Sequence, residues 1–155
     1  TNLSEGRGCT RPFHLVGAPW INRSVFTDLC RKGAIDAGLD GIAFREATFE
    51  PRFQKHAGQI CHGIEIFVQS RWAMNATLLG LVVLEAALRE NSGAFAWRTE
   101  TYEFVDDPIA IDLLCGSAEA RMGLESRMSP RELIEGWKGE IEAFTELRAE
   151  QLLYT

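Results

Sequence analysis

The segment "HGIEIFVQS" (residues 62–70) alternates along its length with the period of two that a β-strand requires. Ile64, Ile66 and Val68 fall on one face of the expected strand, with other side chains between them. The preceding segment "GIAFREATFEP" (41–51) alternates in the same way. The two segments therefore predict two strands of a β-sheet.

The run "ATLLGLVVLEAAL" (76–88) is the most apolar part of the chain. Asn75 suits the N-cap position before it, because its side chain can accept a hydrogen bond from the first turn. The run contains Glu85 and is well short of the roughly 20 residues that span a bilayer. It therefore predicts a buried helix, which the glycine of "NSGAF" brings to an end.

Upstream of the two strands, "PFHLVGAPWI" (12–21) predicts a strand that ends in the turn "GAPW". The next segment, "NRSVFTDLCRKG" (22–33), predicts a helix. Asn22 or Ser24 is its expected N-cap, and Gly33 is its expected stop.

The second half of the chain is predicted to be mostly helical. After a further strand at "WRTETYEF" (97–104), "DDPIAIDLLCGS" (106–117) predicts a helix with Pro108 in its first turn and Gly116 at its end. A long helix is expected over 129–153, opened by a capping box. Its apolar stripe is expected to pack on the sheet and consists of Leu133, Ile134, Trp137, Ile141, Phe144 and Leu147.

Length and composition favour one globular domain. The chain has 155 residues, of which 46% are hydrophobic and 25% charged, enough for a core of its own. It contains no internal repeat or low-complexity linker. We expect a single domain over residues 1–155, an α/β fold of the α+β kind, with a mixed β-sheet packed with helices.

Charge and cysteine content exclude several classes of function. Lys and Arg number 16 against 22 Asp and Glu, a formal charge of −6, so no basic surface for nucleic acid or an anionic membrane is expected. The cysteines are widely separated and contain no CxxC pair, which argues against a zinc site and leaves disulfide bridges open. They are Cys9, Cys30, Cys61 and Cys115.

The opening segment "TNLSEGRG" (1–8) has the residue types of a functional loop. Gly6 and Gly8 allow unusual backbone dihedrals and a close approach to a ligand. Glu5 offers a carboxylate, and Arg7 offers a planar fork that suits a carboxylate group. The alternative is a polar turn in which Glu5 and Arg7 pair with each other or cap a helix.

The segment "PRFQKHAGQIC" (51–61) is expected to be a long crossing loop or a short helix that can line a cleft. Lys55 and His56 are candidates for an acid, a base or a substrate ligand. A lone loop histidine is, however, more often solvated. Both readings stay open for His56.

Three other groups of polar residues have structural explanations. Cys61 and His62 point to opposite faces of a strand, so a buried Cys61 is favoured over a nucleophile and base. Glu65 is expected on a solvated sheet face, where Arg45 of the neighbouring strand pairs with it. The "VDD" segment (105–107) resembles a metal-binding carboxylate pair, but helix capping before the proline is favoured.

Several separated segments together carry a family resemblance. They are "TNLSEGRG" (1–8), "GAPW" (17–20), "FEPRFQKHAGQICHG" (49–63), "YEFVDDPIAIDLLCGS" (102–117) and "LLY" (152–154). In order and spacing they resemble the carboxy-terminal part of the NamZ family of exo-β-N-acetylmuramidases. In that family an amino-terminal Rossmann-like domain precedes this region, and the active-site cleft lies where the two parts meet.

The resemblance implies that residues 1–155 are the carboxy-terminal part of a larger glycosidase that hydrolyses non-reducing-terminal N-acetylmuramic acid. Residues 1–8 would then form a domain-junction and active-site loop, with a partly apolar or poorly ordered surface over residues 2–8. Glu5 is the expected catalytic residue. The expected substrate-binding residues are Ser4, Gly6, Arg7, Gly8, Lys55 and His56.

The implied partners are a peptidoglycan-derived sugar and the amino-terminal Rossmann-like domain of the same protein. The resemblance implies no metal and no cofactor, and it favours a secreted, periplasmic or cell-envelope location. We expect no membrane span and no hydrolysis by the isolated chain. The alternative function is a non-catalytic module that binds cell-wall sugar or docks an enzyme.

Overall fold

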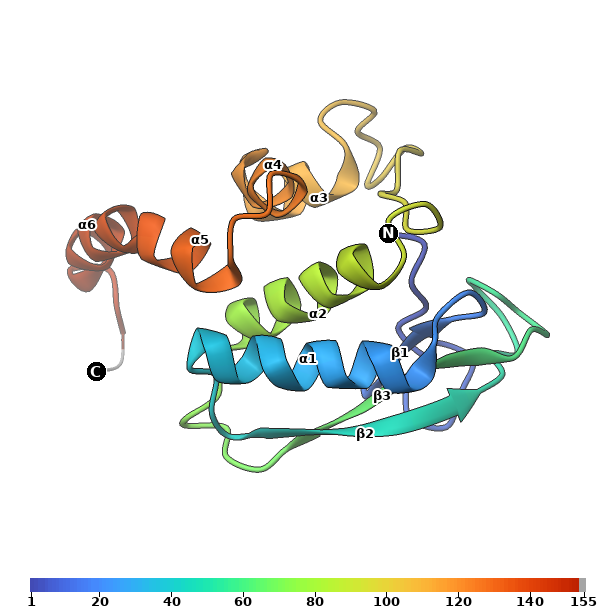
Figure 1. The fold of residues 1–155 in the computed structure, drawn as a ribbon. Helices are drawn as coiled ribbons and strands as arrows, with labels where there is room; N and C mark the ends of the chain where they lie inside the picture. Colours follow the sequence, from blue (N-terminus) through green and yellow to red (C-terminus); the bar gives the residue numbers. More distant parts are fainter. Residues whose placement is uncertain (154–155) are drawn as a thin grey trace.

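The computed structural model describes residues 1–153, in which the chain forms three strands and six helices. The expected α+β class is confirmed (Figure 1). The elements are β1 (Leu15–Ala18), α1 (Arg23–Ala37), β2 (Ile42–Phe49), β3 (Cys61–Val68), α2 (Ala76–Glu90), α3 (Ala110–Cys115), α4 (Glu119–Glu125), α5 (Pro130–Gly136) and α6 (Lys138–Ala149).

The sheet has the strand order β1-β3-β2, and both pairings are antiparallel. The expectation of a mixed sheet was therefore wrong. The connection from β1 through α1 to β2 makes these two strands run in the same direction, but β3 lies between them and is antiparallel to both.

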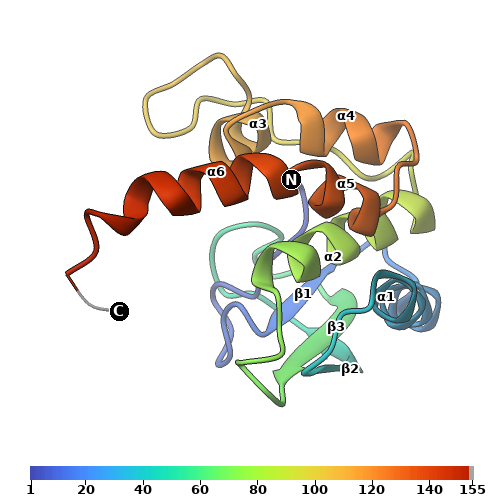
Figure 2. The ribbon, with the colours of Figure 1, turned by 90° about the vertical axis from the view of Figure 1, so that its left-hand side faces the viewer.

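Helices α1 and α2 lie side by side over one face of the sheet (Figures 1 and 2). As predicted, Asn22 accepts a hydrogen bond from the Val25 N–H at 3.2 Å, and Asn75 accepts one from the Leu78 N–H at 3.0 Å. These cap bonds fix where each helix begins. The core lies between the two helices and the apolar face of the sheet. The buried residues of the core include Phe26, Phe44, Ile64, Ile66 and Val82.

Gly33 does not end α1, contrary to expectation. The helix continues to Ala37, and Gly38 ends it in the left-handed conformation with φ of 68°. A Cβ atom at Gly33 would lie 3.2 Å from Cγ1 of Val82 on α2. The glycine therefore allows the two helices to pack closely, which the local sequence does not reveal.

The strand expected at 97–104 is absent from the described part of the chain. Tyr102 and Val105 instead form an isolated two-residue bridge. Asp106 accepts a hydrogen bond from the Thr101 hydroxyl at 2.5 Å, and the N-cap of α3 is Ile109, which makes no side-chain cap bond. The expected capping by the "VDD" segment was therefore wrong, because Asp106 bonds in the preceding turn and α3 begins only after Ile109.

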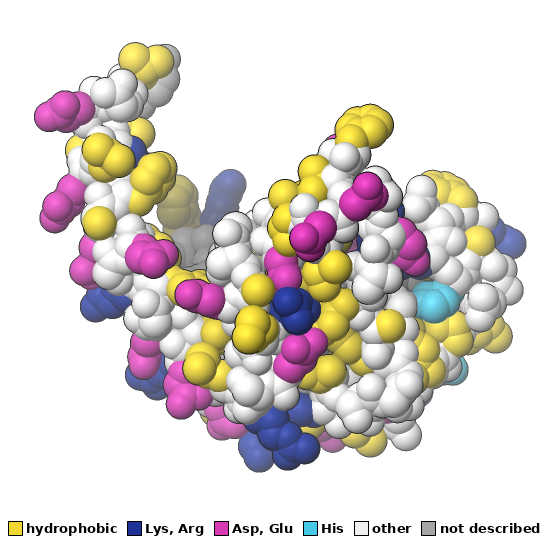
Figure 3. Space-filling view, turned by 90° about the horizontal axis from the view of Figure 1, so that it is seen from above, with side chains coloured by type: hydrophobic (Ala, Val, Ile, Leu, Met, Phe, Trp, Pro, Cys, Tyr) yellow, Lys and Arg dark blue, Asp and Glu magenta, His cyan; other side chains and the backbone are white. Residues whose placement is uncertain are grey.

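The single helix expected over 129–153 is divided at Trp137 into α5 and α6, with the predicted capping box of Ser129 and Glu132 at its start. Leu133 packs with α2 and α4, not on the sheet, because α3, α4 and α5 lie on the far side of α2 from the sheet (Figure 1). Helix α6 has no buried residue and projects from the body as an arm with apolar side chains along it (Figures 2 and 3). Its exposed apolar residues are Ile141, Phe144 and Leu147.

Candidate functional site

The opening segment adds one short bridge to the free edge of β1. The Ser4 N–H donates to the Gly17 carbonyl at 2.8 Å, and the Gly17 N–H donates to the Ser4 carbonyl at 3.0 Å. Asn2 exchanges three hydrogen bonds with Ala94 and Ala96, which follow α2. The segment is thus held between the sheet and the end of α2.

The expectation of a partly apolar or poorly ordered surface over residues 2–8 was wrong for three of its members. Leu3 belongs to the main core, Ser4 is only 2% exposed, and Gly6 is buried. An open cavity nevertheless lies beside Leu3 and Ser4. This cavity of about 330 Å³ lies between the opening segment and α2, with Val16, Leu79 and Leu84 partly buried in its wall.

Glu5, Arg7 and Lys55 form an ionic cluster at this cavity, although they come from two loops about fifty residues apart. Lys55 Nζ lies 2.8 Å from Glu5 Oε2, and Arg7 Nε lies 3.1 Å from Glu5 Oε1. Each carboxylate oxygen therefore has its own cation. Glu5 and Arg7 therefore pair with each other, as in the alternative of a polar turn, and the fold brings the candidate residue Lys55 to the same carboxylate.

The surroundings of Glu5 favour its ionised form. Burial alone raises the pKa of the carboxyl, but hydrogen bonds from Lys55 and from its own backbone N–H, together with the charges of Lys55 and Arg7, lower this pKa overall. Glu5 is therefore a carboxylate at neutral pH. Such a group can stabilise positive charge or accept a proton, and it is a poor proton donor.

Lys55 and His56 also hold the opening segment in place. His56 Nε2 lies 2.7 Å from the Asn2 carbonyl, so this nitrogen carries the proton, and Lys55 Nζ donates to the Thr1 carbonyl at 3.3 Å. The expected loop over 51–61 contains no helix, and its His56 takes a φ of 60°. His56 is thus a tethered residue rather than a freely solvated one.

Gly6 and Gly8 adopt the positive φ angles that the sequence predicts, 73° and 83°. Both glycines approach protein atoms closely. A Cβ atom on Gly6 would lie 2.9 Å from Cβ of Leu15, and one on Gly8 would lie 2.7 Å from the backbone nitrogens of Arg52 and Phe53. The two glycines therefore let the opening loop fold tightly against β1 and against the loop after β2.

Glu65 is not solvated, contrary to expectation, although its predicted pairing with Arg45 is confirmed. It is 4% exposed and forms ion pairs with both Arg45 and Arg11. The guanidinium groups of Arg11 and Arg45 each lie 5.3 Å from the centre of the Phe67 ring. The sequence gives no signal for Arg11, because only the fold of the 6–14 loop brings it over this face of the sheet.

The cysteines form no disulfide and no metal site among the described residues. Cys61 is buried as predicted, burial raises the pKa of its thiol to about 11, and all four cysteines are free. Among residues 1–153, no three His, Cys, Asp or Glu side chains lie together in a group that could hold a metal ion. No helix in the same range has the length and apolar character of a membrane span.

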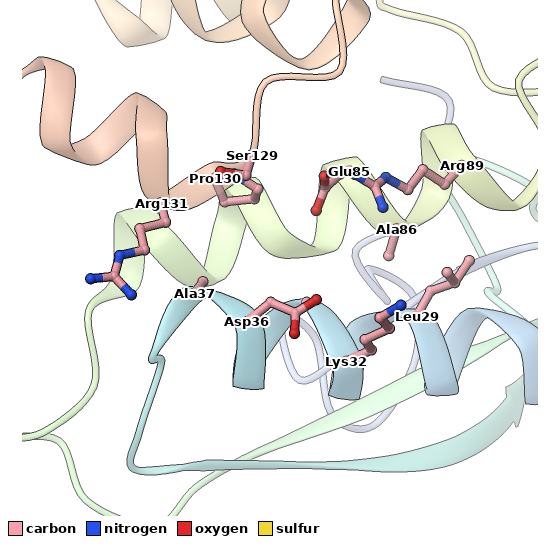
Figure 4. A pocket seen from close by; sticks show the side chains of 11 residues that line it. Leu29, Lys32, Asp36, Ala37, Glu85, Ala86, Arg89, Ser129, Pro130 and Arg131 are labelled. Carbon is pink, nitrogen blue, oxygen red and sulfur yellow. Dashed lines mark ion pairs between the residues drawn. The ribbon is translucent and has the colours of Figure 1, made fainter.

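A second cavity lies between α1, α2 and α5 (Figure 4). Glu85 of the apolar helix lies in its wall and pairs with Arg89 at 2.6 Å. Burial raises the pKa of Glu85, although Arg89 acts in the opposite direction. At about 70 Å³ this cavity is too small for a sugar ring, so we assign it to helix packing.

Residues 1–154 match the family model described as exo-β-N-acetylmuramidase NamZ, C-terminal. The chain is 32% identical over 154 residues to the peptidoglycan β-N-acetylmuramidase NamZ of Bacillus subtilis (strain 168), with 99% of this chain and 34% of that protein covered. The chain thus spans about a third of the length of this curated relative. A crystal structure of a DUF1343 family protein from Bacteroides fragilis NCTC 9343 has a similar fold, with a TM-score of 0.77 at 19% identity, over 99% of this chain and 38% of the other.

Within the described residues, the family segments "TNLSEGRG" and "FEPRFQKHAGQICHG" meet at the ionic cluster, while "YEFVDDPIAIDLLCGS" lies in the loop before α3 and in α3 itself. Tyr154 of the "LLY" segment lies outside the described residues.

Proposed function

Because the chain belongs to the NamZ C-terminal family, we propose that it forms part of an exo-β-N-acetylmuramidase that processes peptidoglycan. The proposed reaction removes N-acetylmuramic acid from the non-reducing end of the substrate. The observation that carries this proposal is the ionic cluster of Glu5, Arg7 and Lys55, of which Glu5 and Lys55 line an open, partly apolar cavity.

The cluster has the chemistry of one half of a glycosidase site. Glycoside hydrolysis usually needs a carboxylic acid that protonates the leaving oxygen and a carboxylate that assists from the other face of the sugar. The lowered pKa of Glu5 suits the second of these roles, that of the ionised carboxylate that stabilises an oxocarbenium-like transition state. The proton donor then has to be another group.

The cations and the cavity wall suit the substituents of N-acetylmuramic acid. This sugar carries a lactyl carboxylate, for which Arg7 and Lys55 provide N–H donors, and methyl groups, for which the apolar wall provides contact. Ser4 is buried, and its hydroxyl accepts a hydrogen bond from the Gly6 N–H at 3.2 Å. Ser4, Gly6, Gly8 and His56 therefore support substrate binding by shaping the two loops.

The proton donor is expected from an amino-terminal part like the Rossmann-like domain that precedes this region in the family. The chain spans 34% of the length of its curated relative, which leaves room for such a part. We expect that the isolated chain does not release N-acetylmuramic acid from a muramyl-glucosaminyl disaccharide, and that the same region joined to its amino-terminal part does.

The test compares Glu5→Gln and Arg7→Lys with the parent in the protein that includes the amino-terminal part. Glu5→Gln should lower turnover by about 100-fold to 10,000-fold, the range of general acid–base contributions, with little loss of thermal stability. Arg7→Lys should narrow the preference for muramic acid over glucosamine substrates, because the bidentate fork is lost. Glu46→Gln is the matched control, since Glu46 is also a partly exposed carboxylate paired to an arginine, at 2.7 Å.

The same measurement separates the enzyme from a sugar-binding module. A module of that kind would cleave no bond in the parent protein, and both substitutions would only reduce sugar affinity. Full turnover in both variants would show that Glu5 and Arg7 form a structural turn, and the proposed catalytic role would be lost.

A further inference from the structure

An open groove, separate from the cavity at Glu5 and lined in part by Arg7, lies between the loop of residues 7–13 and the end of β2 with the loop that follows it. Its volume is about 900 Å³, more than twice that of the cavity at Glu5. Leu15 and Phe49 lie along the groove, and two exposed aromatic rings stand on it, Phe13 at 64% and Phe53 at 60% exposure. The groove is large enough for sugar rings.

The two walls of the groove are fixed to each other. The Arg52 N–H donates to the Gly8 carbonyl at 3.0 Å, and the lack of a side chain at Gly8 lets the two backbones touch. The Phe13 N–H donates to the Glu5 carbonyl at 2.7 Å, which closes the 5–13 loop. The paired Arg11 and Glu65 hold this loop on the sheet, so the groove exists before any ligand binds.

The same two loops contain three non-glycine residues with positive φ. Phe13, Gln54 and His56 are three of the six non-glycine residues with positive φ among residues 1–153, with angles of 67°, 68° and 60°. This conformation is unfavourable for residues that carry a Cβ atom, and strained residues of this kind gather at binding sites. In Phe13 the strained backbone carries a ring that stays exposed to solvent.

Arg7 connects the groove to the cluster around Glu5. Its guanidinium group pairs with Glu5 and lies 5.4 Å from the centre of the Phe13 ring. Arg7 is therefore the residue through which the groove adjoins Glu5. We propose that this groove binds the glycan on the leaving-group side of the scissile bond, with Phe13 and Phe53 packed against sugar rings; this inference rests on the proposed function.

The charge of the groove favours a glycan of this composition. Arg7 and Arg52 give it two positive charges against the single negative charge of Glu50. A glycan that contains muramic acid carries a lactyl carboxylate on every second sugar, and this charge complements a net positive groove. The planar guanidinium groups can also donate hydrogen bonds to the acetamido carbonyls.

The test measures binding of two defined probes to the 155-residue chain by calorimetry. The probes are the muramyl-glucosaminyl disaccharide and the tetrasaccharide that contains two such units. We expect tighter binding of the tetrasaccharide. Phe53→Ala should weaken tetrasaccharide binding by about tenfold, within the range of single aromatic contacts. Phe104→Ala is the matched control, because Phe104 is 99% exposed and lies in the loop before α3.

Phe13→Asn tests the second ring while its backbone conformation is kept, because asparagine tolerates positive φ. We expect a similar loss of tetrasaccharide affinity with an unchanged circular dichroism spectrum. The proposal is overturned if the tetrasaccharide does not bind, or if Phe53→Ala and Phe13→Asn bind it as the parent does. Full turnover in Glu5→Gln with weakened tetrasaccharide binding in Phe53→Ala would instead refute the catalytic role of Glu5 and leave the groove in place.

Discussion

Removal of both arginines that neutralise the buried Glu65 should destabilise the protein by more than the sum of the two single changes. Arg11 and Arg45 each pair with a different carboxylate oxygen. Either single change to alanine leaves one cation, so each should cost about 1 kcal/mol, between the values of exposed pairs and of charged hydrogen bonds. The double change leaves a buried charge unpaired and should cost about 4 kcal/mol.

The coupling free energy is therefore expected to be about 2 kcal/mol, and it can be measured by urea unfolding of the parent, both single variants and the double variant at pH 7. Glu65→Gln added to the double variant should recover about half of the loss, because it removes the unpaired charge but not the lost contacts with Phe67. Arg52→Ala is the control, since the Arg52 side chain is exposed and pairs with the exposed Glu50.

Two results would refute this reasoning. If the single effects add to the double effect within about 0.5 kcal/mol, Glu65 does not depend on the two arginines jointly. If Glu65→Gln gives no recovery in the double variant, the loss comes from packing on Phe67 and not from the buried charge.

Two further predictions concern the helices. Burial raises the pKa of Glu85 above its ordinary value of 4.5, so the folded state holds this proton to higher pH than the unfolded state, and this contribution to stability is lost as pH rises through the folded pKa. Between pH 4 and pH 7, the free energy of unfolding, measured with urea, should therefore fall less in the Glu85→Gln variant than in the parent. The same pH dependence in both proteins would contradict this. Helix α6 has no buried residue, so Phe144→Ser should leave the melting temperature within about 2 °C of the parent. Leu133 belongs to the neighbouring core cluster, so Leu133→Ala should lower the free energy of unfolding by about 2–5 kcal/mol. Equal effects of these two substitutions would contradict the exposed position of α6.

The parts of the fold that could be predicted are those whose signals are local. The alternation in β2 and β3 and the Asn22 and Asn75 caps depend on residues a few positions apart, and the structure agrees with them. The errors have distant causes. Gly33 has the local features of a helix stop, but it packs against Val82 inside α1. Residues 97–104 have strand-forming residue types, but in the fold only Tyr102 pairs, with Val105 of the same loop.

The candidate site shows the same division. Residue types together with the family resemblance selected Glu5, Arg7 and Lys55, but only the fold shows that one carboxylate receives both cations. Glu65 was assigned to a solvated face because its alternation was read without Arg11, which lies 54 positions earlier in the chain. Exposed rings such as Phe13 and Phe53 have no pattern of their own in the sequence.

The ties of Asn2 to the segment after α2 have a consequence for the order of events during synthesis. The hydrogen bond between Asn2 and the Ala96 N–H joins residues 94 positions apart. At about 5–20 residues per second, the ribosome adds the later partner roughly 5–20 s after the earlier one. A nascent chain that ends before residue 96 therefore lacks the last tether of the segment that carries Glu5, and this tether forms only after Ala96 has been added.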